Sequence, residues 1–182
     1  MTVTVNLFQR LSLEDPEGHW ELHAGRILEK PIMSAGHNRA IVRLTTQLVQ
    51  QVDPEEFDVR GNTARTSRAD EVYYIPDVMV IPAALVLPFL VPGSGVEVYD
   101  APLPLIVEVW SPSTGGYDVD AKLPEYQRRG DLEIWRRHPF DRTLTIWRRQ
   151  VDGSYEEETV RGGTVCPIGL PGVVINLDAL FV

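Results

Sequence analysis

The sequence has little cysteine, little lysine and no long apolar segment. Its single cysteine, Cys166, excludes a disulfide within the chain and offers no cluster of thiolates for a metal ion. No apolar run is long enough to span a bilayer. The first residues, MTVTVNLFQR, lack the basic and apolar regions of a secretory signal. We therefore expect a cytoplasmic protein that does not contact a membrane.

The sequence also lacks an excess of positive charge. Its 17 lysine and arginine residues stand against 26 acidic residues, and the net charge of −9 argues against broad electrostatic adhesion to nucleic acid. Between positions 128 and 149, however, seven arginines stand against three acidic residues. Arginine clusters suit phosphate contacts. The alternative, which we favour, is that these arginines occupy outward-facing strand positions and keep a sheet soluble.

The rest of the composition, with 43% hydrophobic residues, is that of an ordinary globular protein, and we expect one domain over residues 1–182. Residue patterns predict a β-hairpin about Ala24-Gly25 and a helix capped by Ser34. The predicted elements in chain order are 7–13 (helix), 20–30 (hairpin), 35–52 (helix), 57–81 (strands around an SRAD loop), 82–104 (irregular connection), 120–130 (helix), and 132–136, 143–149 and 154–160 (strands). An apolar tail, LPGVVINLDALFV, is expected to dock on the core.

One carboxylate stands inside an apolar strand pattern. Glu108 lies in LPLIVEVW, between Val107 and Val109. Burying an ionised carboxylate in such company is costly unless a cation or hydrogen-bond donors meet it. Glu108 is therefore the first candidate for a functional residue.

A second carboxylate, Asp77, follows Pro76 and leads directly into the apolar VMVI segment. Neighbouring strands could bring Asp77 and Glu108 to one ion, and hard oxygen ligands suit Mg²⁺, with Mn²⁺ as an alternative. Lys122, one of only two lysines, could orient or deprotonate an attacking water or stabilise charge on phosphorus. The alternative for Asp77 is a turn aspartate that accepts backbone hydrogen bonds. The other lysine, Lys30, is expected to be exposed.

Several segments together resemble the Uma-two family, whose members are restriction-endonuclease-like proteins of the PD-(D/E)XK nuclease superfamily. These segments are WELHAGRILEKPIMSAGHNRAI, PDVMVI, IVEVWSPST, D-x-x-x-K-x-x-x-Y from position 118, G-x-x-E-x-W from position 130, and the terminal LPG-x-x-x-x-L-x-x-L-F. The resemblance covers nearly the whole chain, and the SPST loop with its flanks is its most specific part.

The resemblance implies an α/β (α+β) fold, with a restriction-endonuclease-like mixed sheet flanked by helices. Asp77 and Glu108 would be the metal ligands, with the Val109 carbonyl as a third, and Lys122 would serve the nucleophilic water. One departure is that Trp110 occupies the superfamily's usual lysine position. Glu21, His37, Asp118 and Tyr126 also match family positions and are expected to be supporting residues.

Two functional classes follow from the resemblance. The first, which we prefer, is a Mg²⁺-dependent endonuclease acting on DNA, expected to be a homodimer because such nucleases cut two strands. The second is a catalytically inactive member of the fold, acting as a structural or nucleic-acid-binding protein. Acidic net charge and Trp110 favour the second class, whereas the retention of two carboxylates and a lysine favours the first.

Overall fold

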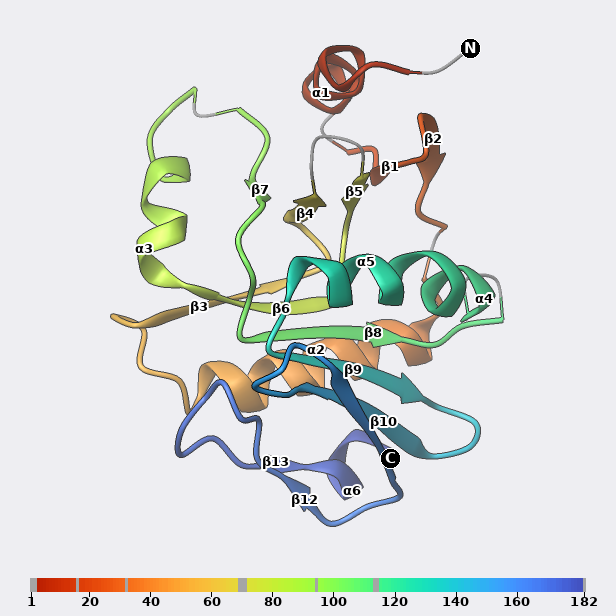
Figure 1. The fold of residues 1–182 in the computed structure, drawn as a ribbon, viewed down its shortest axis with the longest axis vertical. Coiled ribbons are helices and arrows are strands. Elements are labelled where there is room, and N and C mark those ends of the chain that lie inside the picture. Colours follow the sequence, from red (N-terminus) through yellow and green to blue (C-terminus); the bar gives the residue numbers. More distant parts are fainter. Residues whose placement is uncertain are drawn as a thin grey trace.

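A six-stranded mixed sheet forms the centre of the fold in this computed structural model (Figure 1). The structure describes residues 3–15, 17–31, 33–68, 72–93, 95–112 and 115–181. In spatial order the central strands are β11 (Tyr155–Val160), β10 (Thr143–Arg149), β9 (Glu133–His138), β8 (Leu105–Val109), β6 (Val78–Pro82) and β3 (Phe57–Gly61). Strands β8 and β9 run parallel, and the other neighbours in this sheet are antiparallel.

A second sheet consists of five short strands. Their order is β2 (Arg26–Glu29), β1 (Trp20–His23), β5 (Val72–Tyr74), β4 (Arg65–Arg68) and β7 (Val98–Tyr99). Strands β1 and β2 form the predicted hairpin, with Ala24 and Gly25 both at positive φ in the turn, as a tight hairpin requires. Helix α1 (Val5–Glu14) packs on this sheet through Phe8, which lies against Leu22 and Tyr73.

Helices cover both faces of the central sheet, because its inner strands are apolar on both sides. On β6, Val78 and Val80 pack with α2 (Ala35–Val49), whereas Met79 and Ile81 pack in the cluster that includes Tyr126 of α5 (Leu123–Arg129). Figure 1 shows α2 and α5 on opposite sides of these strands. Among the described residues, no helix is long and apolar enough to cross a membrane.

The chain's end docks on the α2 side, as predicted. It contains β12 (Thr164–Val165), β13 (Ile175–Asn176) and α6 (Leu177–Leu180), and its apolar side chains join the α2 core cluster. Arg43 of α2 donates a hydrogen bond to the carbonyl oxygen of Ala179, and Gln47 donates one to that of Asn176. The tail is therefore held by both apolar packing and side-chain hydrogen bonds.

Most predicted elements are confirmed with small shifts of their ends, and two predictions need correction. The segment 82–104 contains α3 (Ala83–Val86), a 3₁₀ turn (Leu87–Phe89) and β7, and β7 pairs parallel with β4. It is therefore not wholly irregular. The predicted SRAD loop begins inside β4, which extends to Arg68, and residues 69–71 lie outside the described part of the chain.

Candidate active site

The two candidate carboxylates lie side by side. Antiparallel pairing of β6 and β8 sets Val78 opposite Val107, so that Asp77, just before β6, lies beside Glu108. Side chains alternate along a strand, and Glu108 therefore points to the same face as Ile106, the α5 side. The backbone N–H of Val109 donates a hydrogen bond of 2.6 Å to Asp77 Oδ2. This bond joins two neighbouring strands, and its residues are 32 positions apart, so it is not the local turn bond of the alternative interpretation.

Asp77 is buried among positive and donor groups. Lys30 Nζ lies 2.7 Å from Asp77 Oδ1, and His37 Nε2 lies 3.0 Å from Oδ2 without meeting hydrogen-bond geometry. Burial alone would raise the pKa of Asp77, but the Lys30 ammonium, together with His37, holds this pKa below its usual range. Asp77 is therefore ionised at neutral pH.

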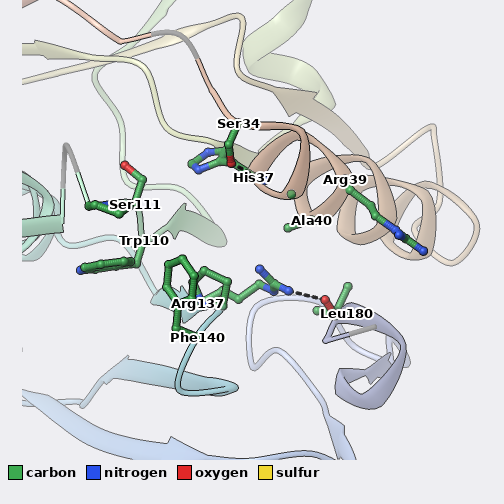
Figure 2. Close-up of a pocket in the computed structure, with 12 residues that line it drawn as sticks. Ser34, His37, Arg39, Ala40, Trp110, Ser111, Arg137, Phe140 and Leu180 are labelled. Carbon is green, nitrogen blue, oxygen red and sulfur yellow. Dashed lines mark hydrogen bonds between the residues drawn. The ribbon is translucent and has the colours of Figure 1, made fainter.

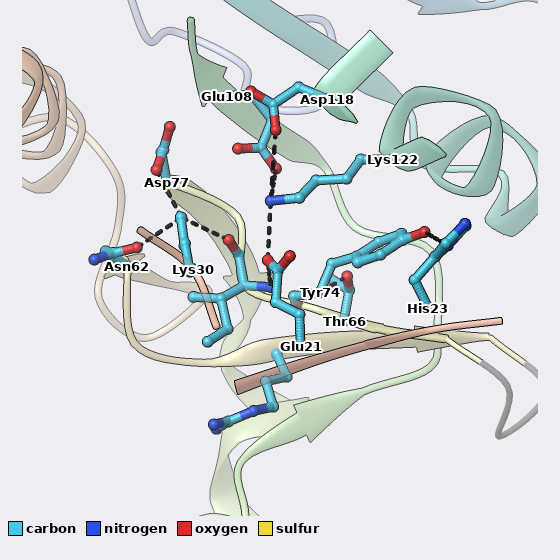
Figure 3. A network of polar contacts seen from close by, with 12 residues as sticks. Glu21, His23, Lys30, Asn62, Thr66, Tyr74, Asp77, Glu108, Asp118 and Lys122 are labelled. Carbon is cyan, nitrogen blue, oxygen red and sulfur yellow. Dashed lines mark hydrogen bonds and ion pairs between the residues drawn. The ribbon is translucent and has the colours of Figure 1, made fainter. Parts of the chain in front are cut away.

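The prediction that Lys30 is exposed is wrong. Its side chain is buried, and its ammonium donates to Asn62 Oδ1, the Ile75 carbonyl oxygen and Asp77 Oδ1, each at 2.7 Å. These three acceptors use all three N–H donors of the group. Lys30 follows directly after β2, so the docking of the N-terminal hairpin carries this charge into the site (Figure 3).

Glu108 is fully buried and meets a hydroxyl and an ammonium. Tyr126 Oη donates a hydrogen bond of 2.7 Å to Glu108 Oε1, and Lys122 Nζ lies 3.3 Å from the same oxygen. Burial raises the pKa of Glu108 to about 8, although Lys122 opposes the shift. In the absence of a further cation, Glu108 therefore holds a proton near neutral pH.

Lys122 connects three carboxylates. Its Nζ lies 2.9 Å from Glu21 Oε1, 3.3 Å from Glu108 Oε1 and 3.7 Å from Asp118 Oδ1 (Figure 3). Burial would lower the pKa of Lys122, but Glu108 and the two other carboxylates raise it well above its usual value. Lys122 is therefore an ammonium ion at any physiological pH. Glu21 is itself fixed, because its Oε1 accepts the N–H of Ile75 at 2.8 Å.

The helix that carries Lys122 begins earlier than predicted. The helical segment runs from α4 (Gly115–Tyr117) through a π-helical turn (Asp118–Lys122) into α5, and Asp118 lies inside it. Leu123 N–H bonds to the carbonyl oxygen of Asp118, five residues back, just before Pro124. Because of this wide turn, the chain can continue as a helix through Pro124, which has no backbone N–H to donate. Gly130, with φ of 83°, ends the helix as predicted.

The charges of the ionised carboxylates at the site exceed those of the lysines by the charge of one divalent cation. Ion pairs join two lysines to four carboxylates, namely Lys30 and Lys122 with Glu21, Asp77, Glu108 and Asp118. With all four carboxylates ionised, two negative charges exceed those of the lysines. Burial is the main cause of the raised pKa of Glu108, and the Asp118 and Asp77 carboxylates add to it.

The donor set fits Mg²⁺ better than a tightly caged metal. Among the described residues, no three His, Cys, Asp or Glu side chains are arranged to hold a metal ion together. Asp77 and Glu108 do lie side by side, and the Val109 carbonyl faces the same neighbouring strand as its N–H, toward Asp77. Mg²⁺ is commonly held by one or two carboxylates and keeps several waters. Two carboxylates and a carbonyl therefore suffice for this ion.

Trp110, which the resemblance would place at the superfamily's usual lysine position, packs away from these charges. Its ring lies 4.2 Å from that of His138, centroid to centroid, and meets Phe140 edge-on. A Cβ placed on Gly115 would lie 1.9 Å from Trp110 Nε1. The indole is therefore fixed between the start of α4 and the end of β9.

This close approach predicts a stability difference between two adjacent glycines. Gly115→Ala should lower the free energy of unfolding by about 1–3 kcal/mol, because the indole must move to admit the methyl group. Gly116→Ala is the matched control, since a Cβ there meets nothing within 4 Å. Urea unfolding measures both variants, and equal effects at the two positions would contradict the close packing.

The arginine-rich segment is not the uniformly outward-facing surface that we favoured. Arg129 and Arg137 are buried, whereas Arg128, Arg142 and Arg149 are exposed. The prediction of outward-facing strand positions is therefore wrong for four of the seven arginines. Arg128 and Arg129 lie in α5, Arg142 lies in the turn before β10, and Arg137 is a buried strand residue.

Comparison with a solved structure identifies the class of fold. The chain matches the crystal structure of a putative nuclease belonging to DUF820 from Anabaena variabilis, with a TM-score of 0.77 and 19% sequence identity. The match covers 98% of this chain and 97% of that one. This likeness confirms the predicted mixed sheet flanked by helices.

The family follows from the sequence itself. Residues 5–178 match the model of the Uma2 family, described as putative restriction endonuclease, and the chain belongs to this family. The resemblance noted from the sequence is thus confirmed. A search of proteins with curated descriptions found no match. The family description is that of nucleases, which act on nucleic acids.

Proposed function

We propose that this protein is a metal-dependent endonuclease that hydrolyses phosphodiester bonds in DNA. Asp77 and Glu108 would bind Mg²⁺, or Mn²⁺ in its place, with the Val109 carbonyl as a third ligand. The observation that carries the proposal is the pair of buried carboxylates on neighbouring strands. With all four carboxylates of the site ionised, two negative charges exceed those of the two lysines. Family membership supports a nuclease.

A bound Mg²⁺ would supply Lewis acidity toward the phosphate and a more acidic water. Lys122 is an ammonium ion, so it can donate hydrogen bonds but cannot take a proton from water. Of the three roles considered for this lysine, orientation of the water and stabilisation of charge on the phosphate remain. Lys30 holds the Asp77 carboxylate in place, and Tyr126 does the same for Glu108.

Metal binding tests the proposal directly. With 10 mM Mg²⁺ and a dissociation constant of about 1 mM, the ion should stabilise the protein by about 1.4 kcal/mol and raise Tm by roughly 3–6 °C. Asp77→Asn should abolish this shift. Thermal unfolding in Mg²⁺ and in EDTA measures it, together with cleavage of plasmid DNA. If the Tm of the wild-type protein does not change in millimolar Mg²⁺ or Mn²⁺, the proposal of a metal site at Asp77 and Glu108 is contradicted.

A second candidate function is nucleic-acid binding without cleavage. It is favoured by Trp110 at the usual lysine position and by the ion pairs that already engage both lysines. Under this alternative, Lys30 and Lys122 serve to neutralise buried carboxylates. DNA that is bound but stays intact in both Mg²⁺ and Mn²⁺ would favour this alternative over the nuclease.

A further inference from the structure

A cavity of about 270 Å³ opens beside the candidate active site (Figure 2). Ser34 and His37, from the start of α2, lie on one side of it. Trp110, Arg137 and Phe140 lie on the other side. None of the described residues that line the cavity is acidic, and Arg39 and Arg137 are basic. The cavity therefore combines positive charge with an aromatic wall.

Arg137 has unused donors at this cavity. Its guanidinium is buried, and Nη2 donates one hydrogen bond, to the carbonyl oxygen of Leu180 (Figure 2). Within the described residues, Nε and Nη1 have no hydrogen-bond partner, and no carboxylate pairs with the group. Burial lowers the pKa of Arg137, and the nearby Arg43 adds to this. A buried cation without an anion is costly, which an anionic ligand would relieve.

The start of α2 adds to the attraction for an anion. Ser34 caps a helix of fifteen residues, and its first turn contains no acidic residue, so no residue of the helix itself offsets the positive end of the helix dipole. His37, in this turn, is buried, and its Nδ1 has no hydrogen-bond partner among the described residues. Arg137 and the start of α2 therefore line the same cavity, and the Arg137 guanidinium there has nitrogens without a partner among the described residues.

The aromatic wall offers a stacking surface. His138 packs against the Trp110 ring and is not among the residues that line the cavity, so it supports the indole from outside. Phe140, largely exposed, stands edge-on to the indole at the same cavity. Aromatic rings beside a positive groove are the usual means of holding unpaired bases.

The cavity adjoins the carboxylate pair through two residues. His37 lines the cavity, and its Nε2 lies 3.0 Å from Asp77 Oδ2. Trp110 follows Val109, whose N–H bonds to Asp77. A strand bound for cleavage at Asp77 and Glu108 would therefore have a neighbouring nucleotide at this cavity.

We propose that this cavity binds one unpaired nucleotide of the substrate strand, with its phosphate at Arg137 and the start of α2 and its base on Trp110. This inference rests on the proposed function and narrows its substrate to DNA with single-stranded or unpaired segments. A base within a duplex is stacked on its neighbours and cannot also lie on the indole. Blunt double-stranded DNA would first have to unstack a base, which costs free energy, so it should bind less tightly.

Binding in EDTA tests the inference without any need for metal or cleavage. Three labelled DNAs are compared by fluorescence anisotropy: a short single strand, its blunt duplex, and a strand of the same length without bases. Wild-type protein should bind the single strand roughly tenfold or more tightly than the other two. Arg137→Gln and Trp110→Leu should each lose most of that preference. Arg142→Gln, at an exposed arginine outside the cavity, should keep it.

The two variants act on different parts of the ligand. Trp110→Leu should not change binding of the strand without bases, whereas Arg137→Gln should weaken it. Circular dichroism shows whether each variant is folded. If Arg137→Gln is unfolded, the inference is tested by the single-strand preference of Trp110→Leu alone. If the wild-type protein binds the single strand and the blunt duplex with equal affinity, the inference is overturned. It is also overturned if both variants bind DNA as the wild-type protein does. Arg137 would then only hold α6 in place, through its hydrogen bond to Leu180.

The outcomes separate this inference from the proposed function. If the single strand is bound at the cavity but never cut in Mg²⁺ or Mn²⁺, the nuclease proposal fails and the cavity assignment stands. If blunt duplex is cut equally well by wild type, Arg137→Gln and Trp110→Leu, the nuclease stands and the cavity assignment fails.

Discussion

Glu108→Gln is expected to lower the rate of Mg²⁺-dependent DNA cleavage by about a thousandfold or more. The substitution keeps the shape of the side chain and an oxygen that can accept the Tyr126 hydroxyl. It removes the negative charge that a divalent ion needs, and the ion's stabilisation of the transition state amounts to several kcal/mol. Cleavage of plasmid DNA under single-turnover conditions measures the rate.

The folded state should tolerate this substitution. Because burial raises the pKa of Glu108 to about 8, the metal-free protein already favours the neutral form at pH 7. In EDTA the variant should therefore unfold at a denaturant concentration no lower than wild type. Glu156→Gln, on the exposed face of β11, is the matched control for loss of one carboxylate and should cleave normally. A Glu108→Gln variant within tenfold of the wild-type rate would exclude Glu108 as a required ligand.

Arg129→Met is expected to lower the free energy of unfolding by about 3–5 kcal/mol. The Arg129 guanidinium donates to the carbonyl oxygens of Ser67, Tyr99 and Ala101, and to both oxygens of Asp131. Methionine fills similar space but leaves these buried acceptors without a donor. Burial already raises the pKa of Asp131, and loss of the arginine would raise it further.

The neighbouring arginine provides the control. Arg128 forms an ion pair with Glu125, but its side chain is 60% exposed, and the buried Glu125 also pairs with Arg68. Loss of Arg128 should therefore cost about 0–1 kcal/mol. Arg128→Met should therefore unfold close to wild type in urea. Comparable losses in the two variants would mean that net charge, rather than the buried contacts of Arg129, determines the effect.

Local patterns were sufficient to locate most elements and to bring forward Asp77, Glu108 and Lys122 as candidate site residues. The apolar context of Glu108 correctly indicated a buried carboxylate on a central strand, because both faces of β8 are covered. Strand positions 132–136, 143–149 and 154–160 correspond closely to β9, β10 and β11. These features depend on residues close together in the chain, which is why the sequence reveals them.

The contacts around the site depend on residues far apart in the chain, and local patterns could not reveal them. Lys30 meets Asp77 across 47 positions, and Glu21 meets the N–H of Ile75 across 54. Periodicity placed Lys30 at a strand end and gave no sign of its burial. One signal was available: fifteen of the seventeen basic residues are arginine, and both lysines lie at the site. Why Lys122 can approach Glu108 despite Pro124 became clear only from the π-helical turn.

The N-terminal hairpin makes the site depend on complete folding. Its residue Glu21 pairs with Lys122, and Lys30, just after β2, pairs with Asp77, so the hairpin closes the site over the central sheet. During synthesis this hairpin emerges well before its partners at positions 77, 108 and 122. Such long-range contacts form late in folding. A chain that is still being synthesised, or one from which the residues up to Lys30 have been removed, therefore lacks the arrangement of charges found in the folded protein.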